Sequence, residues 1–315
     1  MAQPSITPAS AATIARLAQS RADDLLACQA LAFRGKAVIA PAMNPAMWSH
    51  PATQANIATL RERGAPWSSP VAGARRAVKR DRAPCRPARI YLAGLPPLAA
   101  DMEGIRVMVT LGPTREHWDG LRFWTNPSTG TMGAAVAVAA WLRGARVEAV
   151  CGPGTPWLPA GIARHNVGSA RHMLEAAASV WPQCDAGVFT AAVADFSPVP
   201  PAQGGDKKFK KSDAPDGFDV HFAPNPDILK TLAADRRPEQ KVVGFAAESQ
   251  NLEDSVRGKL VSKKADMVVG NLLQDGFGTP DNTVFVADAS GREERWAHLS
   301  KTDVAWRLLS WLLSR

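Results

Sequence analysis

Polar residues gather between positions 122 and 133, where the sequence reads RFWTNPSTGTMG and leads into a run of small apolar residues. Hydroxyl groups beside the free amides of a helix N-terminus suit an anion. Asn126 can both donate and accept hydrogen bonds, which suits an acyl group whose charge changes during a reaction. Capping of the helix by Ser128 or Thr129 is the alternative, but it gives no reason for Arg122 and Asn126. We therefore treat Arg122 and Asn126 as catalytic candidates.

A lysine-rich segment supplies a second candidate. Residues 206–211 read DKKFKK and lie in a polar insertion at 198–215 that is rich in Pro, Gly and Lys. A loop this long inside a compact domain is often a lid or binding loop. A lysine on a mobile loop can close over a triphosphate and neutralise charge as it develops. The alternative is a solvated run of charge.

Two further loops follow predicted strands and hold residues that packing alone does not require. Gly112, in LGPTR at 111–115, lets the backbone approach a ligand, although a tight turn is the simpler explanation. Ala191 and Ala192 open the segment AAVADF and leave room for a ligand against the backbone. In the same segment, Asp195 either accepts hydrogen bonds from a base or ribose or serves as a cap.

A last group of candidates lies further along the chain. Lys259 and Lys263 are four residues apart in a predicted helix, so they share one face. They point either toward phosphates or toward water. The other members of the group stand in two short motifs, NPDI and GFAAE, and are Asn225, Pro226, Asp227, Ile228 and Phe245.

A regular alternation of strands and helices must position these loops. Short apolar runs predict strands at 105–110, 146–151, 185–191, 241–246 and 266–269, and an edge strand at 283–287. Helices are predicted at 132–143, 169–180, 227–234, 252–264 and 302–313. The pattern predicts an α/β fold, a doubly wound (Rossmann-like) parallel sheet with ligands at the carboxyl ends of its strands.

Composition shifts divide the chain into three parts. Residues 1–91 combine an alanine-rich helical pattern with one strand at 37–40. Residues 92–104 carry Gly and Pro and predict a linker. Residues 105–315 form the α/β domain described above.

Several classes of function lack their sequence signals. Neither GxxxxGK[ST] nor GxGxxG occurs, which argues against a P-loop protein and an NAD-dependent dehydrogenase. The four cysteines lie far apart, and no cluster of His, Cys and carboxylates has metal-ligand spacing, so we expect no protein-held metal site. The net charge of +8 has no nucleic-acid motif beside it, and small polyanionic substrates suit it better. No apolar run approaches the roughly 20 residues of a membrane span, and no secretory signal is recognisable, so we expect a cytoplasmic protein.

The order and spacing of the motifs resembles bacterial phosphopantothenoylcysteine synthetase, the ligase of coenzyme A biosynthesis. TLGPTREHWDGLRFWTNPSTGTMGAAVA, AAVADF, KFKK, NPDIL, GFAAES and DMVVGN follow in the family's order over residues 103–315. The resemblance implies that CTP activates the carboxylate of 4'-phosphopantothenate as an acyl-cytidylate, releasing pyrophosphate, and that the amine of cysteine then displaces CMP. It also implies Mg²⁺ carried on the phosphates and a homodimer formed through this domain.

The same resemblance implies roles by motif position. Lys208 is the mobile lysine needed for cytidylate formation, and Asn126 holds the acyl-cytidylate with Arg122 nearby. Ala191 and Ala192 leave space for this intermediate. Contacts to CTP are implied for Asp195, Phe245, Lys259 and Lys263, with Asn225, Pro226, Asp227 and Ile228 lining the nucleotide pocket. Thr131 stands where the family usually has a lysine, which weakens the expected anion site.

Residues 1–91 resemble the C-terminal half of a flavin-dependent phosphopantothenoylcysteine decarboxylase domain. VIAPAMNPAMWSHPATQANIATLRERG carries its PAMN motif, in which Asn44 is implied to contact the substrate carboxylate. The resemblance begins inside that domain, so its early strands and part of its FMN site have no counterpart here. In the segment that matches the substrate flap, 73–87, Ala77 falls where the reactive cysteine belongs. Our hypothesis for that arginine-rich segment is a compensated frameshift, and resequencing that found an intact flap in the genome would exclude this origin.

The sequence leaves three functions open. The first is a CTP-dependent ligase with an inactive decarboxylase remnant, and we expect such a protein to be colourless. The second is a bifunctional enzyme that also decarboxylates phosphopantothenoylcysteine with FMN, which a yellow protein would favour. The third is a non-catalytic partner of another flavoprotein, which nucleotide binding without turnover would favour. The choice of CTP over ATP rests on the family alone.

Overall fold

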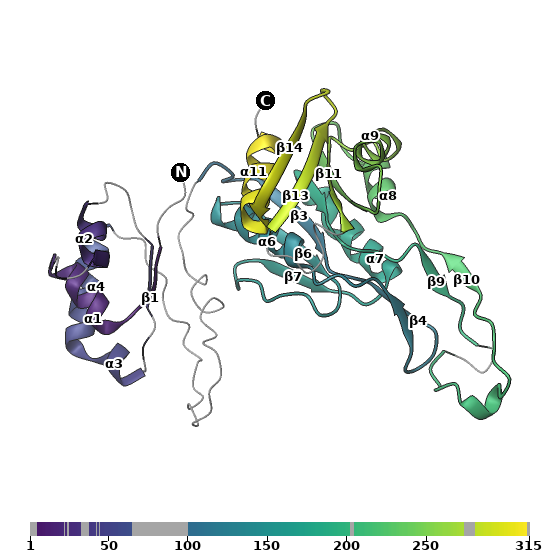
Figure 1. Cartoon of the computed structure of the whole chain (residues 1–315), viewed down its shortest axis with the longest axis horizontal. Helices are drawn as coiled ribbons and strands as arrows, with labels where there is room; N and C mark the ends of the chain where they lie inside the picture. Colours follow the sequence, from purple (N-terminus) through teal and green to yellow (C-terminus); the bar gives the residue numbers. More distant parts are fainter. Residues whose placement is uncertain are drawn as a thin grey trace. The chain divides into compact units, whose positions relative to one another are not determined.

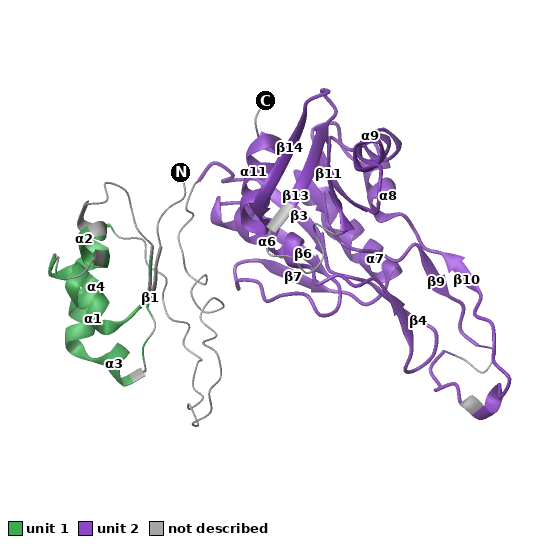
Figure 2. Ribbon diagram, in the orientation of Figure 1, with its two compact units in different colours: residues 1–98 green, residues 99–315 purple. Residues whose placement is uncertain are grey.

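The structure, a computed structural model, describes residues 5–21, 23, 25–32, 38–41, 43, 45–64, 100–201, 205–273 and 281–313. The chain divides into two compact units, Met1–Leu98 and Ala99–Arg315, each of which is described by itself (Figure 2). Asn44 and Ala77, with the rest of segment 73–87, lie outside the described residues.

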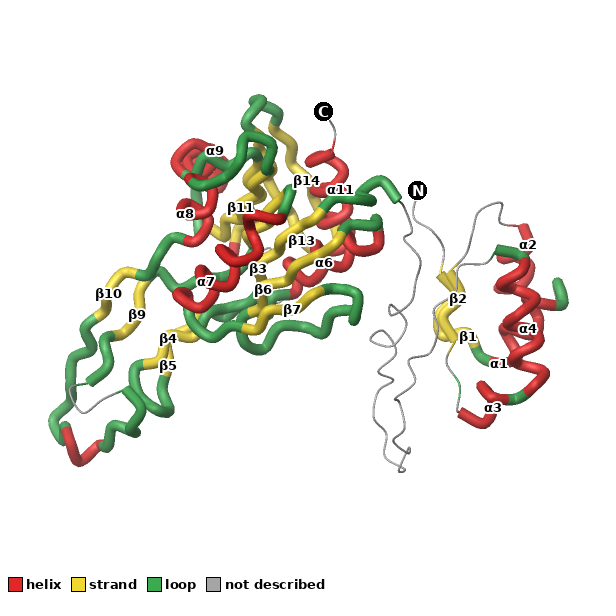
Figure 3. The backbone as a smooth tube through the Cα atoms, turned by 180° about the vertical axis from the view of Figure 1, so that it is seen from behind, coloured by secondary structure: helices red, strands yellow, loops and turns green. Residues whose placement is uncertain are grey.

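The first unit sets a pair of parallel strands beside helices (Figure 3). Its elements are β1 (Ser5–Ala9), α1 (Ala11–Ala18), α2 (Leu25–Ala32), β2 (Val38–Pro41), α3 (Pro45–Ser49) and α4 (Pro51–Glu62). Ile14 and Leu17 of α1 pack with Ile57 and Leu60 of α4 to form its core. The strand predicted at 37–40 is present as β2. Strand β1 was missed because SITPA is short, contains proline and shows no apolar alternation.

The second unit is built on an eight-stranded sheet in the order β14-β13-β12-β11-β8-β3-β6-β7 (Figure 1). The strands from β12 to β7 are parallel, while β13 and β14 are antiparallel. The bounds are β3 (Arg106–Leu111), β6 (Arg146–Cys151), β7 (Ala163–Asn166), β8 (Ala186–Phe189), β11 (Lys241–Glu248), β12 (Met267–Leu272), β13 (Asp281–Asp288) and β14 (Glu293–Ser300). The α/β fold with a mostly parallel sheet is confirmed.

The edges of this sheet differ from the prediction. The strand predicted as an edge at 283–287 is β13, and β14 pairs with it on its outer side. Strands β14 and β7 were not predicted, because edge strands expose most of their side chains and therefore lack an apolar run. In β14 only Trp296 is buried, and β7 has no buried residue.

Helices cover both faces of the sheet, as predicted (Figures 1 and 3). Helices α6 (Thr131–Leu142) and α11 (Lys301–Leu313) share one core, to which they contribute Val136 and Leu308. Helices α7 (Ala170–Val180), α8 (Ile228–Ala234) and α9 (Leu252–Ser262) share the core on the other face. Short 3₁₀ helices occur at Trp181–Gln183 and Lys211–Asp213.

Two short antiparallel strand pairs leave the sheet together. They are β4 (Arg115–His117) with β5 (Phe123–Thr125), and β9 (Phe196–Pro198) with β10 (Phe222–Pro224). Figure 1 shows β4, β9 and β10 running away from the sheet, and β4 and β5 both contact β9. We call residues 115–125 and 196–224 the arm. The lysine-rich segment 206–211 lies in the loop between β9 and β10.

A buried arginine ties the start of this unit to its last helix. Arg143 is 2% exposed and binds Asp101 through two hydrogen bonds of 3.0 and 2.6 Å. The same guanidinium donates to the backbone oxygen of Trp306 and to the Ser310 hydroxyl in α11. Met102 is also buried, so residues 101 and 102, inside the stretch 92–104, are attached to the second unit by the Arg143 hydrogen bonds and by packing of Met102.

Helix α6 lies so close to the sheet that Gly133 has no room for a side chain. A Cβ there would lie 2.2 Å from Thr190 Oγ1 and 2.5 Å from Leu111 Cβ. We expect Gly133→Ala to lower the free energy of unfolding by about 1–3 kcal/mol, because Leu111 Cβ cannot swing away. Urea unfolding of the full chain, followed by tryptophan fluorescence, measures this.

The matched control is Gly258→Ala in α9, where an added Cβ meets nothing within 4 Å. That variant is expected to gain about 0.5–1 kcal/mol from helix propensity. Equal stability of the two variants would contradict the close contact of α6 with the sheet.

Candidate active site

The loops after β3, β6 and β8 meet at the carboxyl edge of the sheet. Gly112 has a φ of +84°, and a Cβ on it would lie 2.3 Å from Thr155 Cγ2. Its carbonyl accepts a hydrogen bond of 2.9 Å from the Ala192 amide. A glycine is therefore required here both by the left-handed backbone and by the approach of the β6 loop.

Asn126 spans from the start of the α6 segment to the loop after β8. Its amide nitrogen donates to the backbone oxygens of Ala192, at 3.4 Å, and Val193, at 3.1 Å. The side-chain oxygen has no hydrogen-bond partner among the described residues, and the residue is half-buried. The structure thus brings Asn126, Ala192 and Gly112 together and orients one acceptor of Asn126 for an outside group.

The first turn of α6 has no side-chain cap. Its N-cap is Gly130, at a φ of +70°, whereas Ser128 Oγ accepts from the Gly130 amide and the Thr129 and Thr131 hydroxyls pair at 2.8 Å. Capping by Ser128 or Thr129, the alternative weighed from the sequence, is therefore wrong. The left-handed Gly130 turns the chain before either hydroxyl reaches the first-turn amides, which leaves those amides suited to an anion.

The loop after β8 also joins the segment before α8. The Asn225 amide nitrogen donates to the Ala194 oxygen at 2.8 Å, and the Asn225 backbone amide donates to the Asp195 oxygen at 2.8 Å. The exposed carboxylate of Asp195 has no partner among the described residues. Pro226 is half-buried, and Ile228 is buried in the core under α8. Asn225 thus fixes the backbone that carries Asp195.

The two lysines of α9 are paired rather than free. Lys259 Nζ lies 2.8 Å from Glu248 Oε1, and Lys263, which caps the end of α9, forms an ion pair with Asp227. Burial raises the pKa of Asp227, but hydrogen bonds from Lys263 and the Lys230 amide outweigh it and hold that pKa below its ordinary value. Burial likewise opposes the Lys259 and Ser255 hydrogen bonds that lower the pKa of Glu248.

Phe245 comes from β11, the same strand that ends at Glu248. It is partly buried against the core that α6 and α11 cover. Phe245 thus faces the core of α6 and α11, whereas Glu248 pairs with Lys259 of α9, which packs on the other face of the sheet. A phosphate that binds either lysine would share its ammonium group with the present carboxylate partner or compete with it.

The two remaining catalytic candidates lie on the arm. Arg122 donates to Asp119 Oδ2 at 2.5 Å and to the Phe209 backbone oxygen at 3.1 Å. Lys208 is exposed and has no ion pair with any described residue. No hydrogen bond or ion pair joins Arg122 or Lys208 to Asn126 among the described residues, and Figure 1 shows the arm running away from the sheet. The roles of Arg122 and Lys208 stay predictions.

A buried carboxylate that the sequence did not single out connects this region. Glu116 is 4% exposed, and its Oε1 accepts a hydrogen bond of 2.9 Å from the Ala170 amide at the start of α7. The Ser197 hydroxyl lies 2.9 Å from Glu116 Oε2 and 2.5 Å from Asn225 Oδ1. The only sequence signal for Glu116 was an acidic residue close to a glycine-containing strand end. The burial of Glu116 depends on contacts with residues far along the chain, which no local pattern shows.

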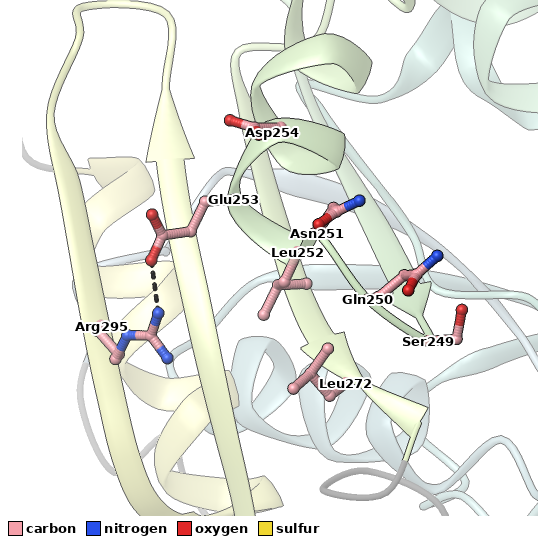
Figure 4. A pocket seen from close by; sticks show the side chains of 8 residues that line it. All are labelled: Ser249, Gln250, Asn251, Leu252, Glu253, Asp254, Leu272 and Arg295. Carbon is pink, nitrogen blue, oxygen red and sulfur yellow. Dashed lines mark hydrogen bonds and ion pairs between the residues drawn. The ribbon is translucent and has the colours of Figure 1, made fainter.

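An open hollow of about 500 Å³ lies at the start of α9, also on the carboxyl side of the sheet. Figure 4 shows its walls, which include an ion pair of 2.5 Å between Glu253 and Arg295. None of its lining residues is a predicted site residue, although Ser249 directly follows Glu248. We place the candidate site at Asn126 and the strand ends, because the unpartnered polar groups lie there.

Two features are absent from the part of the chain that the structure describes. Within it, no group of three or more His, Cys, Asp or Glu side chains has a geometry that holds a metal ion. No described helix is long and apolar enough to cross a membrane.

The fold and the site define the second unit as a DNA/pantothenate metabolism flavoprotein C-terminal domain, whose family model matches residues 102–315. A second family model, Flavoprotein, matches residues 5–83. A crystal structure of the C-terminal domain of coenzyme A biosynthesis bifunctional protein CoaBC is 34% identical with a TM-score of 0.57, and it covers 68% of this chain and 97% of its own.

Curated relatives extend the similarity along nearly the whole chain. The coenzyme A biosynthesis bifunctional protein CoaBC of Bacillus subtilis is 39% identical over 313 residues, which is 96% of this chain and 76% of that protein. The protein of the same name from Mycolicibacterium smegmatis is 36% identical, over 96% of this chain and 77% of that protein. The chain belongs to the family of CoaBC bifunctional proteins of coenzyme A biosynthesis.

The ion pair at the end of α9 gives a pH-dependent prediction. We expect Lys263→Met to raise the pKa of Asp227 toward its ordinary value, as measured by carboxyl NMR titration. A partly exposed pair contributes about 0.2–1 kcal/mol. Because the folded pKa of Asp227 is lowered, this contribution is complete above the unfolded pKa of about 3.9 and is lost as pH falls through the folded pKa.

The stability difference between wild type and Lys263→Met is therefore expected at pH 7 and absent in strong acid. Lys264→Met is the control, since Lys264 has no ion pair with a described residue. An Asp227 pKa that is the same in wild type and Lys263→Met would contradict the pair.

Proposed function

We propose that the second unit ligates 4'-phosphopantothenate to cysteine with CTP, giving 4'-phosphopantothenoylcysteine. Membership in the coenzyme A biosynthesis family supports a ligase in this pathway. The observation that carries the proposal is the free side-chain oxygen of Asn126 beside the uncapped first turn of α6. Together they offer one polar contact for an acyl group and amides for an anion within a single loop.

The reaction takes two displacements. A carboxylate oxygen of 4'-phosphopantothenate attacks the α-phosphorus of CTP, the bond to the β-phosphate breaks, and pyrophosphate leaves. The amine nitrogen of cysteine then attacks the acyl carbon, CMP leaves with the electron pair of the broken carbon–oxygen bond, and the nitrogen loses a proton. Both steps move negative charge onto phosphate oxygens, which positive groups stabilise.

In this proposal some residues bind the acyl group and others bind the nucleotide. Asn126 holds the acyl group, and the small side chains of Ala191 and Ala192 leave space for the acyl-cytidylate. Lys208, free of any described partner, neutralises the charge that develops at the α-phosphate. The contacts to CTP that remain are assigned to Asp195, Phe245, Lys259, Lys263 and the segment 225–228.

Mg²⁺ fits this chemistry as a companion of the nucleotide. Mg²⁺ binds through substrate phosphates together with one or two carboxylates more often than in an all-protein cage. The exposed, unpartnered carboxylate of Asp195 is suited to a water-mediated contact with such an ion. The ion would balance the charge of the triphosphate when bound.

Pyrophosphate release tests the proposal. The purified full chain is given 4'-phosphopantothenate, Mg²⁺, cysteine and either CTP or ATP. We expect release with CTP, and a loss of about 100-fold or more in Lys208→Ala and in Asn126→Ala, because each removes a group that acts on developing charge. Lys207→Ala is the matched control, since it is the neighbouring exposed lysine outside the KFKK motif.

The outcomes separate the candidate functions. The ligase assignment is supported if Lys207→Ala still releases pyrophosphate and Lys208→Ala does not. Release with ATP alone would overturn the choice of CTP. Binding of CTP without any release by folded wild-type protein would exclude ligase activity and leave a non-catalytic role.

A second candidate function is decarboxylation by the first unit with FMN. The match of residues 5–83 to the Flavoprotein family model favours it. Ala77 argues against it, because the flap of the resembled decarboxylase family has its reactive cysteine at this position. Flavin absorbance of the purified protein, together with release of CO₂ from phosphopantothenoylcysteine, decides between the two. A colourless protein without CO₂ release leaves the ligase alone.

We also propose that the second unit forms a homodimer through the arm. Leu121, Trp124, Phe196 and Phe218 all lie on the arm, and each is more than half exposed. Four large apolar side chains exposed on one projecting segment favour an interaction surface over a solvated one. The occupant we propose is the arm of a second copy, which offers the same apolar side chains for an isologous contact.

Sedimentation velocity tests the dimer. We expect wild-type protein to sediment as a dimer and Trp124→Ser to shift toward the monomer at the same concentration. Val261→Ser is the control, because Val261 is 79% exposed on α9 and lies off the arm. A wild-type monomer at all concentrations would exclude this contact.

A further inference from the structure

Asp119 is a fully buried carboxylate in the turn between β4 and β5. Its side chain is 0% exposed, although the turn lies on the outward-reaching arm. Oδ1 accepts from the backbone amides of Leu121, at 2.8 Å, and Arg122, at 2.5 Å. Oδ2 accepts from the Arg122 guanidinium at 2.5 Å and from the Phe209 amide at 3.0 Å. A buried charge persists only with partners of this kind.

One of these four hydrogen bonds, from the Phe209 amide, does not help to form the turn. The bonds from Leu121 and Arg122 shape the turn itself, as an aspartate commonly does two or three residues ahead. The Phe209 amide comes from a position 90 residues later. Arg122 completes this contact, because its guanidinium also donates to the Phe209 oxygen at 3.1 Å. The backbone N–H of Phe209 is thus bound by the Asp119 carboxylate, and its backbone oxygen by the Arg122 guanidinium.

Packing fixes the same stretch of backbone. The Trp118 ring contacts the rings of Phe209, at 5.0 Å, and Phe218, at 4.8 Å between centroids. The Gly120 amide donates to the Lys207 oxygen at 3.4 Å, and a Cβ on Gly120 would lie 2.3 Å from the Asp206 oxygen. The turn therefore touches the peptide groups on either side of Lys208.

We propose that Asp119 is a positioning residue that holds the backbone on both sides of Lys208, so that the lysine side chain swings from a fixed point. The inference rests on the role of Lys208 in the proposed function. Lys208 itself stays exposed and unpartnered among the described residues, so the restraint acts on its backbone and leaves its ammonium group free. Ordering the backbone before the reaction removes an entropy cost from the step that Lys208 assists.

The charge of Asp119 persists across ordinary pH. Burial acts to raise the pKa of Asp119, but the hydrogen bonds from the Arg122, Leu121 and Phe209 amides and the charge of Arg122 lower it to about 2. The carboxylate is therefore ionised at neutral pH, and the restraint is constant rather than switched by protonation.

Asp119→Asn tests the inference in the full chain. An asparagine keeps the shape but presents only one acceptor oxygen, so its amide group faces a donor at Arg122 or Phe209. We expect hydrogen exchange at the Phe209 amide and trypsin cleavage after Lys207 and Lys208 to become at least tenfold faster. Pyrophosphate release is expected to lose at least tenfold in kcat, with little change in KM for CTP.

A double variant separates positioning from general damage. If Asp119 acts through Lys208, then Asp119→Asn combined with Lys208→Ala is no slower than Lys208→Ala alone. If the double variant instead loses kcat by the product of the two single-variant losses, the inference is overturned. Asp288→Asn is the matched control, because Asp288 also accepts from backbone amides, those of Ser290 and Arg292, but lies in β13. It is expected to alter neither the exchange at Phe209 nor kcat.

Gly120→Ala provides a second route if Asp119→Asn does not fold. It leaves Asp119 intact and pushes the Asp206 backbone away from the turn, so we expect the same faster exchange and lower kcat. Wild-type exchange and wild-type kcat in either folded variant would overturn the inference. If wild-type protein releases no pyrophosphate, the proposed function fails, and the exchange of Phe209 alone still decides whether Asp119 holds the loop.

Discussion

The close contact of α6 with the sheet is the constraint on which the rest of the second unit depends. At Gly133 no side chain fits between the helix and the residues Leu111 and Thr190. The contact brings the start of α6 to the carboxyl ends of β3 and β8. Gly112 and Gly130 then adopt left-handed conformations, because the chain must turn there with Thr155 beside both. In this geometry the Asn126 side chain reaches the backbone of the loop after β8.

Two buried carboxylates from one short segment organise the two halves of the site. Glu116 links the start of α7 to Ser197, which in turn contacts Asn225, and so it supports the sheet edge at which we propose that the nucleotide binds. Asp119 holds the loop that carries Lys208. Burying a carboxylate without partners is costly, so each also binds several donors that fix its surroundings. The segment TREHWD thus connects the sheet edge to the arm.

The separation of the candidates has a physical consequence for the proposed reaction. Asn126 lies at the rigid edge of the sheet, while Arg122 and Lys208 lie on an arm that runs away from it. A rigid acceptor and a movable cation suit a reaction in which charge appears at one point and must be neutralised only then. The lysines of α9 are paired with Glu248 and Asp227, so in the proposed reaction a phosphate would compete with these carboxylates for them.

The sequence by itself determined the α/β class, the central strands and the covering helices of the second unit. Buried parallel strands are continuous apolar runs, and the apolar residues of a covering helix recur every three to four positions. It also named Asn126, Gly112 and the Ala191–Ala192 step as candidates, since packing alone rarely requires polar or small residues directly after such strands. It did not find β1, β7 or β14, whose exposed or irregular side chains carry no periodic signal. Only the tertiary structure decided that the α9 lysines are paired, that Gly130 displaces a hydroxyl cap, and that Glu116 and Asp119 are buried. Most of these depend on partners tens of residues away, and no local pattern records a contact that only the folded chain creates.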